Sequence, residues 1–180
     1  MDALDVGAST GGFTDCLLQR GAPRVIALDV AHGQLEWSLR NDPRVEVIER
    51  TNARSLVPSD LPFVPALATI DVSFISLVKV IPAVAECVAA DGELLAMVKP
   101  QFELGRARVK AGVVRAAEDR REALVIVATA AAELGLAVRG FASSGLPGPK
   151  GNRETFMWAT RAGDGLDAQG IEQAALEVEP

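Results

Sequence analysis

The segment Asp5-Val-Gly-Ala-Ser-Thr-Gly-Gly-Phe13 decides the fold, because it leads from a short apolar run through a glycine-rich turn into a helix. Three later apolar runs also stop at one ionisable residue: residues 25–28 before Asp29, 67–70 before Asp71, and 94–98 before Lys99. Such runs are typical of strands buried on both faces of a parallel sheet, whose ligands bind outside the carboxyl ends of the strands. We therefore expect an active site along one sheet edge, where these four ionisable residues gather.

The rest of the sequence alternates between strand and helix patterns. Further strands are expected at 45–49, 137–141 and 155–160, and helices near 13–20, 34–39, 81–88 and 117–134. This alternation predicts an α/β fold with a mostly parallel, doubly wound sheet. No helix separates the last two strands, so they should form an antiparallel hairpin at the C-terminal edge of the sheet. Residues 1–161 form the domain in this interpretation, and 162–180 form an acidic C-terminal tail with a weak, frayed helix.

Size and composition exclude several classes of protein. The 180 residues support one domain, and 49% hydrophobic residues exclude a disordered chain. The apolar stretch of residues 123–132 carries no charge, but it is about half of the ~20 residues that span a bilayer. Cys16 and Cys87 have no Cys or His at metal-ligand spacing, so we expect two buried, reduced thiols and no metal. With no signal peptide visible, the expected location is the cytoplasm, without a membrane partner.

The net charge of −6 is unevenly distributed. The tail after Arg161 carries five acids and no base, which leaves −1 for residues 1–161. The segment from Lys99 to Glu122 contains four acidic residues and seven basic ones, which are Lys99, Arg106, Arg108, Lys110, Arg115, Arg120 and Arg121. A basic stretch beside the expected active site is compatible with a polyanionic substrate. Charge alone slightly favours an ordinary solvated loop and helix start.

The glycine-rich turn after the first strand indicates which cofactor the chain binds. A dinucleotide-binding turn needs glycine at positions 7, 9 and 12, but position 9 is Ser9, and no P-loop lysine follows. An acidic strand end before Gly-x-x-x-Gly looks instead like the S-adenosylmethionine site of Rossmann-like methyltransferases. Asp29, at the end of the second strand, is well placed to accept hydrogen bonds from both ribose hydroxyls. The alternative is an ordinary strand–helix turn of an unrelated α/β protein.

The residues that carry out the reaction at this sheet edge are inferred mainly by excluding other kinds of methyltransferase. The segment Asp71-Val-Ser-Phe74 lacks the two prolines of amino-group methyltransferases, and both cysteines fall on helices rather than at the edge. His32 lies closer to the cofactor than to a substrate, or is simply a solvated loop residue. Asp71 beside Lys99 remains at the centre of the edge. Lys99 could act as a general base, or the two could form a structural ion pair; two charged strand ends side by side favour the functional reading.

Seven motifs then occur in order along nearly all of residues 3–160: Leu4-Asp-Val-Gly-Ala-Ser-Thr-Gly-Gly-Phe-Thr14, Gly33-Gln-Leu35 with Trp37, Glu49-Arg-Thr-Asn-Ala-Arg54, Ile70-Asp-Val-Ser-Phe-Ile-Ser-Leu77, Val98-Lys-Pro-Gln-Phe-Glu103, Gly112-Val-Val-Arg115, and Gly148-Pro-Lys-Gly-Asn152 followed by Glu154. With this set the chain resembles the TlyA (haemolysin A-like) group of ribosomal RNA 2′-O-methyltransferases, within the FtsJ/RrmJ-like superfamily. The resemblance implies a Rossmann-like S-adenosylmethionine methyltransferase fold.

The resemblance also implies roles for particular residues. The superfamily uses a Lys-Asp-Lys-Glu tetrad, in which Asp71, Lys99 and Glu154 match the last three members and Lys99 becomes the general base. The implied cofactor-binding residues are Asp5, Gly7, Ser9, Thr10, Gly11, Gly12, Phe13, Asp29, Asn52 and Asp71. The first tetrad lysine and an S4-type RNA-binding domain lie upstream of the glycine loop in the family. We therefore expect this chain to be the methyltransferase domain alone.

Two main hypotheses about function follow. In the first, the domain transfers a methyl group from S-adenosylmethionine to a ribose 2′-hydroxyl of ribosomal RNA, at cytidine, with ribosomal RNA or ribosomal subunits as partners. In the second, it is a truncated or non-catalytic module that binds the cofactor or another protein. A nicotinamide-dependent reductase is a distant third, which Ser9 disfavours. The sequence leaves the oligomeric state open.

Overall fold

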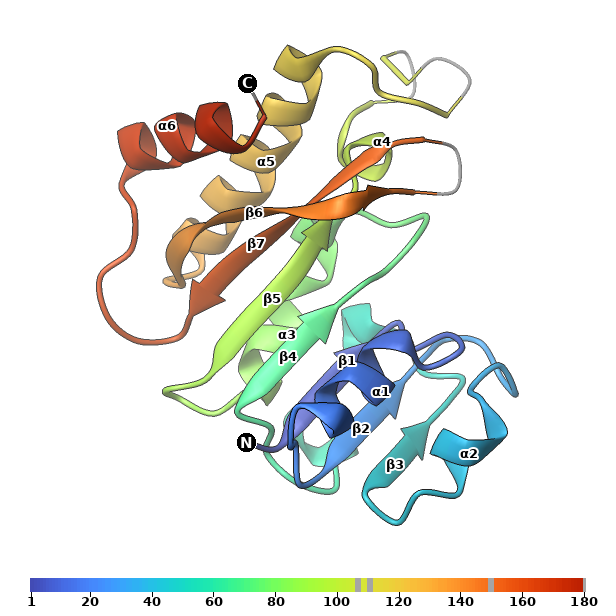
Figure 1. Cartoon of the computed structure of the whole chain (residues 1–180). Helices are drawn as coiled ribbons and strands as arrows, with labels where there is room; N and C mark the ends of the chain where they lie inside the picture. Colours follow the sequence, from blue (N-terminus) through green and yellow to red (C-terminus); the bar gives the residue numbers. More distant parts are fainter. Residues whose placement is uncertain (106–107, 110–111, 149–150, 180) are drawn as a thin grey trace.

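The computed structural model describes residues 1–105, 108–109, 112–148 and 151–179. Its centre is a seven-stranded sheet in the order β3-β2-β1-β4-β5-β7-β6 (Figure 1). The strands are β1 (Ala3–Val6), β2 (Val25–Leu28), β3 (Val45–Ile48), β4 (Leu67–Ile70), β5 (Glu93–Val98), β6 (Ala137–Pro147) and β7 (Arg153–Thr160). The first five are parallel, whereas β7 runs antiparallel to both β5 and β6. The predicted mixed α/β sheet with an antiparallel edge hairpin is confirmed.

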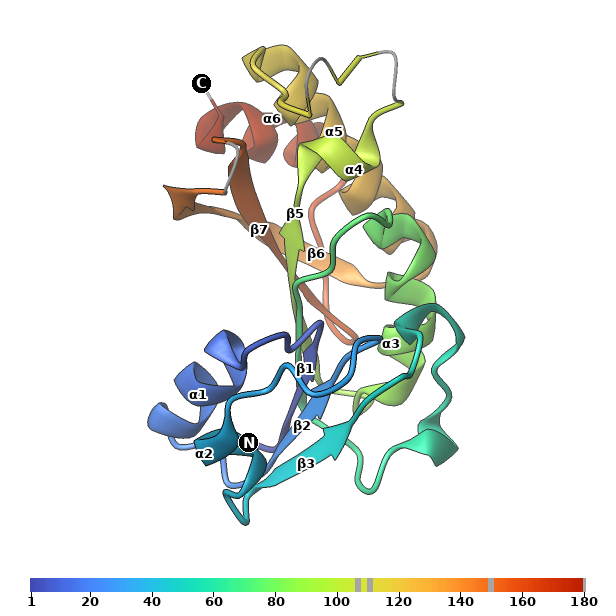
Figure 2. The same cartoon turned by 90° about the vertical axis from the view of Figure 1, so that its right-hand side faces the viewer.

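Helices cover both faces of this sheet. They are α1 (Gly12–Gln19), α2 (Trp37–Arg40), α3 (Ile81–Cys87), α4 (Pro100–Glu103), α5 (Ala117–Glu133) and α6 (Ala168–Val178), with the short 3-10 helices η1 (Ala53–Ser55), η2 (Pro58–Asp60) and η3 (Leu77–Lys79). Figure 2 shows α1 and α2 on one face and α3 and α5 on the other. Because side chains alternate along a strand, Ala3 of β1 packs in the smaller core under α1, whereas Leu4 packs in the larger core under α3 and α5.

The expectation of a frayed C-terminal helix was wrong. In α6, Ile171 and Ala175 are buried in the larger core. Just beyond the helix, the carboxylate of Glu179 is also buried and accepts a hydrogen bond from Arg120 Nε of α5 at 2.8 Å. The acidic composition had suggested a solvated segment, but the last acid is neutralised by a cation about 60 residues away in sequence. The tail therefore contains a packed helix.

Candidate active site

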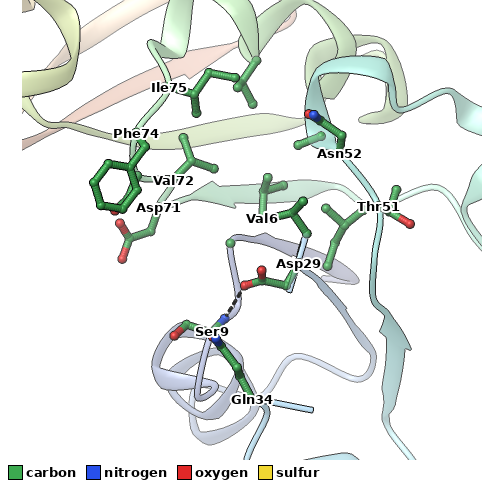
Figure 3. Close-up of a pocket in the computed structure, with 16 residues that line it drawn as sticks. Val6, Ser9, Asp29, Gln34, Thr51, Asn52, Asp71, Val72, Phe74 and Ile75 are labelled. Carbon is green, nitrogen blue, oxygen red and sulfur yellow. Dashed lines mark hydrogen bonds between the residues drawn. The ribbon is translucent and has the colours of Figure 1, made fainter. Parts of the chain in front are cut away.

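A cavity of about 500 Å³ opens at the carboxyl ends of β1, β2 and β4, where the sequence predicted a site. Figure 3 shows Asp71, Val72 and Phe74 on one side of it and Thr51 and Asn52 on the other. Its wall is formed by the loops that follow these strands, and by the loop after β3. The lining residues are Val6, Gly7, Ser9, Leu28, Asp29, Val30, Gln34, Thr51, Asn52, Ala53, Asp71, Val72, Ser73, Phe74, Ile75 and Val80.

The glycine-rich turn approaches the loop after β4 very closely. Gly7 has a φ of +86°, and a Cβ atom at this position would lie 2.2 Å from the carbonyl oxygen of Asp71. Ser9 is also in the left-handed region, with a φ of 49°, a conformation that few residues other than glycine adopt. The turn therefore folds tightly between two strand ends without a glycine at position 9.

Asp29 is the first residue after β2 and faces the cavity (Figure 3). Its Oδ2 atom accepts a hydrogen bond from Ser9 N at 2.8 Å, and its Oδ1 atom accepts one from Ala31 N at 2.7 Å. Two backbone donors thus fix the carboxylate. Since each carboxylate oxygen can accept more than one hydrogen bond, both oxygens keep the capacity to bind hydroxyl groups in the cavity.

The structure divides the predicted cofactor residues into three sets. Gly7, Ser9, Asp29, Asn52 and Asp71 line the cavity. Thr10, Gly12 and Phe13 line a second cavity of about 440 Å³, which shares Gly7, Ser9 and Asp71 with the first. Gly11 and Asp5 line neither: a Cβ at Gly11 would lie 2.3 Å from Leu39 Cδ1, so the position is packed against α2.

Asp5 does not gather with the other ionisable residues at the sheet edge. It lies inside β1, one residue before the strand ends, and is fully buried. Thr14 Oγ1 of α1 donates to its Oδ2 atom at 2.7 Å, and Thr69 Oγ1 of β4 donates to its Oδ1 atom at 3.2 Å. Burial raises the pKa of Asp5 from 3.8 to about 6. This carboxyl joins β1, β4 and α1 beneath the glycine-rich turn.

Replacing Asp5 by Asn should remove part of the pH dependence of stability. The folded state binds the proton of Asp5 more tightly than the unfolded state does, so the protonated carboxyl contributes to the free energy of unfolding. This contribution is complete below about pH 3.8 and is lost as the pH rises through about 6. Relative to Asp5→Asn, the wild type should lose about 1.4 kcal/mol of unfolding free energy between about pH 5 and about pH 7.5. Urea unfolding of both proteins at these pH values measures the difference. Parallel pH dependence in the two proteins would contradict it.

Lys99 and Asp71 form an ion pair at the centre of the edge. Lys99 Nζ lies 2.6 Å from Asp71 Oδ1 and donates to Ser73 Oγ at 3.1 Å. The Lys99 side chain is only 12% exposed, so its ammonium group is held among these partners rather than in bulk water. Asp71 also lines both cavities, and the pair therefore lies where a bound molecule would be within reach.

Glu154 comes to the same place from the antiparallel hairpin. Val98 at the end of β5 lies opposite Thr155 of β7, so one residue further along Lys99 lies opposite Glu154. Directly opposed residues point to the same face, with Cβ atoms about 4.5–5.5 Å apart. Burial raises the pKa of Glu154, while the charge of Lys99 opposes this rise and that of Asp71 adds to it. The structure thus brings Asp71, Lys99 and Glu154 together.

Sequence reasoning missed several cavity residues that carry no charge. Gln34, Thr51, Val72, Phe74 and Ile75 line the cavity, from the loops after β2, β3 and β4. The sequence feature that could have indicated them is their position, since each lies a few residues beyond the end of a strand. Phe74 is exceptional, because it is 91% exposed and has a φ of 65°. Its ring contacts that of Phe102, with centroids 5.2 Å apart.

The basic stretch after Lys99 is largely neutralised within the chain. Arg108 pairs with Asp119 and Glu122, Arg120 with Glu179, and Arg121 with Glu118. Arg115 is exposed and has no acidic partner among the described residues, while Arg106 and Lys110 lie outside them. Lys150 of the Gly148–Asn152 motif is also outside the described part. The described bases of this stretch therefore fit a solvated loop and helix start better than a free polyanion-binding patch.

The remaining candidate residues take peripheral positions. Cys87 is buried but Cys16 is exposed, so the expectation of two buried thiols was wrong for Cys16, which lines the second cavity from α1. His32 is on the surface and contacts Glu49. Within the described ranges, no group of His, Cys, Asp and Glu could hold a metal ion, and no helix is long and apolar enough to cross a membrane.

The sequence of the chain matches known methyltransferases, in agreement with the geometry of the site. The model of the family described as FtsJ-like methyltransferase matches residues 1–161. The chain belongs to the FtsJ-like methyltransferase family. Within that family it is 50% identical over 173 residues to the 16S/23S rRNA (cytidine-2′-O)-methyltransferase TlyA of Mycobacterium tuberculosis. The match covers 95% of this chain but 65% of that protein. The resemblance to the TlyA group is confirmed.

Solved structures support the same assignment of the fold. A Streptococcus thermophilus protein, 39% identical, superposes with a TM-score of 0.92 over 99% of this chain and 66% of that one. An S-adenosylmethionine-dependent methyltransferase from Mesorhizobium loti, 14% identical, superposes with a TM-score of 0.63 over 89% of this chain and 90% of that one. The second comparison shows a shared fold alone. The expected Rossmann-like methyltransferase fold is thereby confirmed for this FtsJ-like chain.

Proposed function

We propose that this chain is an S-adenosylmethionine-dependent methyltransferase domain that acts on a ribose 2′-hydroxyl of ribosomal RNA, at cytidine. The observation that carries the proposal is the Lys99–Asp71 ion pair at a cavity that Asp71 itself lines. The substrate class is supported by the M. tuberculosis relative, which is named for cytidine 2′-O-methylation of 16S and 23S rRNA. The proposed partners are ribosomal RNA or ribosomal subunits in the cytoplasm.

The residues of the larger cavity fit S-adenosylmethionine. A volume of about 500 Å³ is ordinary for a small-molecule site. Asp29 would accept hydrogen bonds from the ribose hydroxyls, Asn52 and Ile75 would flank the adenine, and the turn from Gly7 to Gly12 would receive the amino-acid moiety. When bound, the cofactor supplies an electrophilic methyl group on sulfur. The residues that line this cavity are neutral or acidic, which suits a ligand that has a cationic centre and no phosphate.

The ion pair supplies the acid–base chemistry in this proposal. Lys99 Nζ, once neutral, would accept the proton of the 2′-hydroxyl, whose oxygen would bond to the methyl carbon while the methyl–sulfur bond breaks and S-adenosylhomocysteine leaves. Asp71 and Ser73 hold Nζ in position through the contacts at 2.6 and 3.1 Å, and Glu154 adds a third polar partner from β7. Because a ribose hydroxyl is a poor acid, holding it close and aligned should supply much of the rate.

The target nucleotide is proposed to enter beside Asp71, which lines both cavities. The second cavity is otherwise lined by the glycine-rich turn and the start of α1, which would receive the amino-acid moiety of the cofactor. Phe74 lies at the rim of the larger cavity and presents a 91% exposed ring. Single-stranded RNA bases stack readily on exposed aromatic side chains. We assign the Phe74 ring to a base of the bound RNA.

Replacing Asp29 by Ala should weaken cofactor binding. Two ribose hydroxyls would lose their acceptor, which costs about 1–3 kcal/mol, or about 5- to 150-fold in affinity. Calorimetric titration with S-adenosylmethionine measures the change. Asp15→Ala is the matched control, because Asp15 is an exposed carboxylate on α1 whose one hydrogen-bond partner among the described residues is Gln19. Equal affinity of wild type and Asp29→Ala would remove Asp29 from the site.

Methyl transfer itself tests the reaction. With radiolabelled S-adenosylmethionine and ribosomal RNA, the label should appear in 2′-O-methylcytidine after digestion to nucleosides. The assay should include a version extended upstream to the length of the relatives, since this chain spans 65% of the M. tuberculosis protein. We expect the extended version to be the more active. Label found on a base instead of a ribose would overturn the proposed reaction.

A further inference from the structure

The loop between β2 and α2 carries one wall of the proposed cofactor site. Asp29, Val30 and Gln34 all line the cavity from this loop. Its two ends are fastened by backbone hydrogen bonds, from Asp29 N to Ile48 O at 3.0 Å and from Glu36 N to Thr10 O at 3.1 Å. Residues 29–31 are also held by backbone hydrogen bonds, from Arg50 N to Ala31 O at 3.2 Å and from Thr51 N to Asp29 O at 3.1 Å. The position of residues 32–35 must therefore come largely from other contacts.

Glu49, the first residue after β3, supplies those contacts. Its Oε1 atom accepts a hydrogen bond from Gly33 N at 2.8 Å and also pairs with Arg40 of α2, while its Oε2 atom lies 2.7 Å from His32 Nδ1. The side chain is only 14% exposed. Arg40 and the Gly33 N–H group lower the pKa of Glu49 to about 2, so the carboxylate is ionised and its hydrogen bonds are charge-assisted. One carboxylate therefore joins β3, α2 and the middle of the loop.

Glu49 is not among the residues that line either cavity by the glycine-rich turn. Its carboxylate can therefore act on a bound cofactor through the loop that it holds. We infer that Glu49 is a positioning residue for S-adenosylmethionine, which keeps Gln34, the neighbour of Gly33, in its binding position. The inference rests on the proposed function, because it presumes that the cofactor occupies this cavity.

Calorimetric titration with S-adenosylmethionine tests the inference on the chain as it is. Glu49→Gln should weaken binding about tenfold, as expected if the loop holds its binding geometry about a tenth of the time. Asp42→Asn is the matched control, since Asp42 forms a comparable ion pair with Arg44 just before β3 and contacts neither the loop nor the cavity. Its affinity should stay within about twofold of wild type. Thermal unfolding of both variants without cofactor shows whether any loss of stability is common to both.

A double-variant cycle separates positioning from a general structural effect. If Glu49 acts through Gln34, Glu49→Gln should cost clearly less affinity in the Gln34→Ala background than in the wild type. Equal costs in the two backgrounds would overturn the inference. If Glu49→Gln does not fold, Arg40→Gln removes a partner of the carboxylate and should weaken binding about threefold; unchanged affinity would overturn the inference.

The outcomes also distinguish this inference from the function on which it rests. A wild-type chain that does not bind S-adenosylmethionine would overturn the proposed function and this inference together. A wild-type chain that binds it, with equal affinity in Glu49→Gln, would overturn the role of Glu49 alone.

Discussion

Lys99→Ala should lower methyl transfer to RNA by about 10²–10⁴-fold, the usual contribution of a positioned general base. Cofactor affinity should change little, because Lys99 does not line the larger cavity, although its partner Asp71 does. The expected result is therefore a slower single-turnover transfer with a nearly unchanged Kd for S-adenosylmethionine. Single-turnover transfer from radiolabelled cofactor, together with calorimetry of the same variant, measures both quantities.

Two further variants separate the proton-accepting role of Lys99 from its charge. Lys99→Arg keeps a cation beside Asp71, but a guanidinium group cannot give up its proton in a protein, so this variant should be as inactive as Lys99→Ala. Lys79→Ala is the control, since Lys79 is an exposed lysine at the end of η3 in the same connection after β4. It should transfer methyl groups like the wild type. Full activity of Lys99→Arg would show that Lys99 serves only as a charge.

The charged part of the site could be predicted from the sequence because strand ends in a parallel sheet meet at one edge. Asp29, Asp71 and Lys99 each follow an uninterrupted apolar run, and the structure places all three directly after a strand. Asp5 looked the same in sequence, but β1 continues for one more residue. Because side chains alternate along a strand, this single residue turns Asp5 toward α1 and away from the edge.

Other features depend on contacts that no local pattern contains. Glu154 reaches Lys99 only through the antiparallel register of β7 against β5, so it was assigned from the family resemblance and not from spacing. The loop residues Val72 and Ile75 follow no helical or strand periodicity. The order of α6 depends on the pairing of Glu179 with Arg120, which are far apart in the chain. Tertiary contacts decide all of these positions, and local sequence patterns do not encode them.

Gly7→Ala should be the most damaging substitution in the cofactor turn. The new Cβ would lie 2.2 Å from the carbonyl oxygen of Asp71, at a φ of +86° that disfavours any side chain. Neither backbone can easily move, because Gly7 N donates to Leu28 O at 2.8 Å and Asp71 N donates to Val6 O at 2.9 Å. We expect a loss of about 3 kcal/mol or more in unfolding free energy. We also expect at least about a hundredfold loss of cofactor affinity, since both Gly7 and Asp71 line the cavity.

Gly12→Ala provides a matched control in the same turn. A Cβ at Gly12 would meet nothing within 4 Å, and Gly12 is the first residue of α1, where alanine is the better helix former by up to about 1 kcal/mol. This variant should therefore be as stable as the wild type or slightly more stable. Denaturant unfolding of both variants compares the stability of the two positions directly, and calorimetric titration of Gly7→Ala against the wild type measures the loss of cofactor affinity. If Gly7→Ala were as stable as Gly12→Ala and bound the cofactor like the wild type, the close approach of the turn to Asp71 could not be what shapes the cavity.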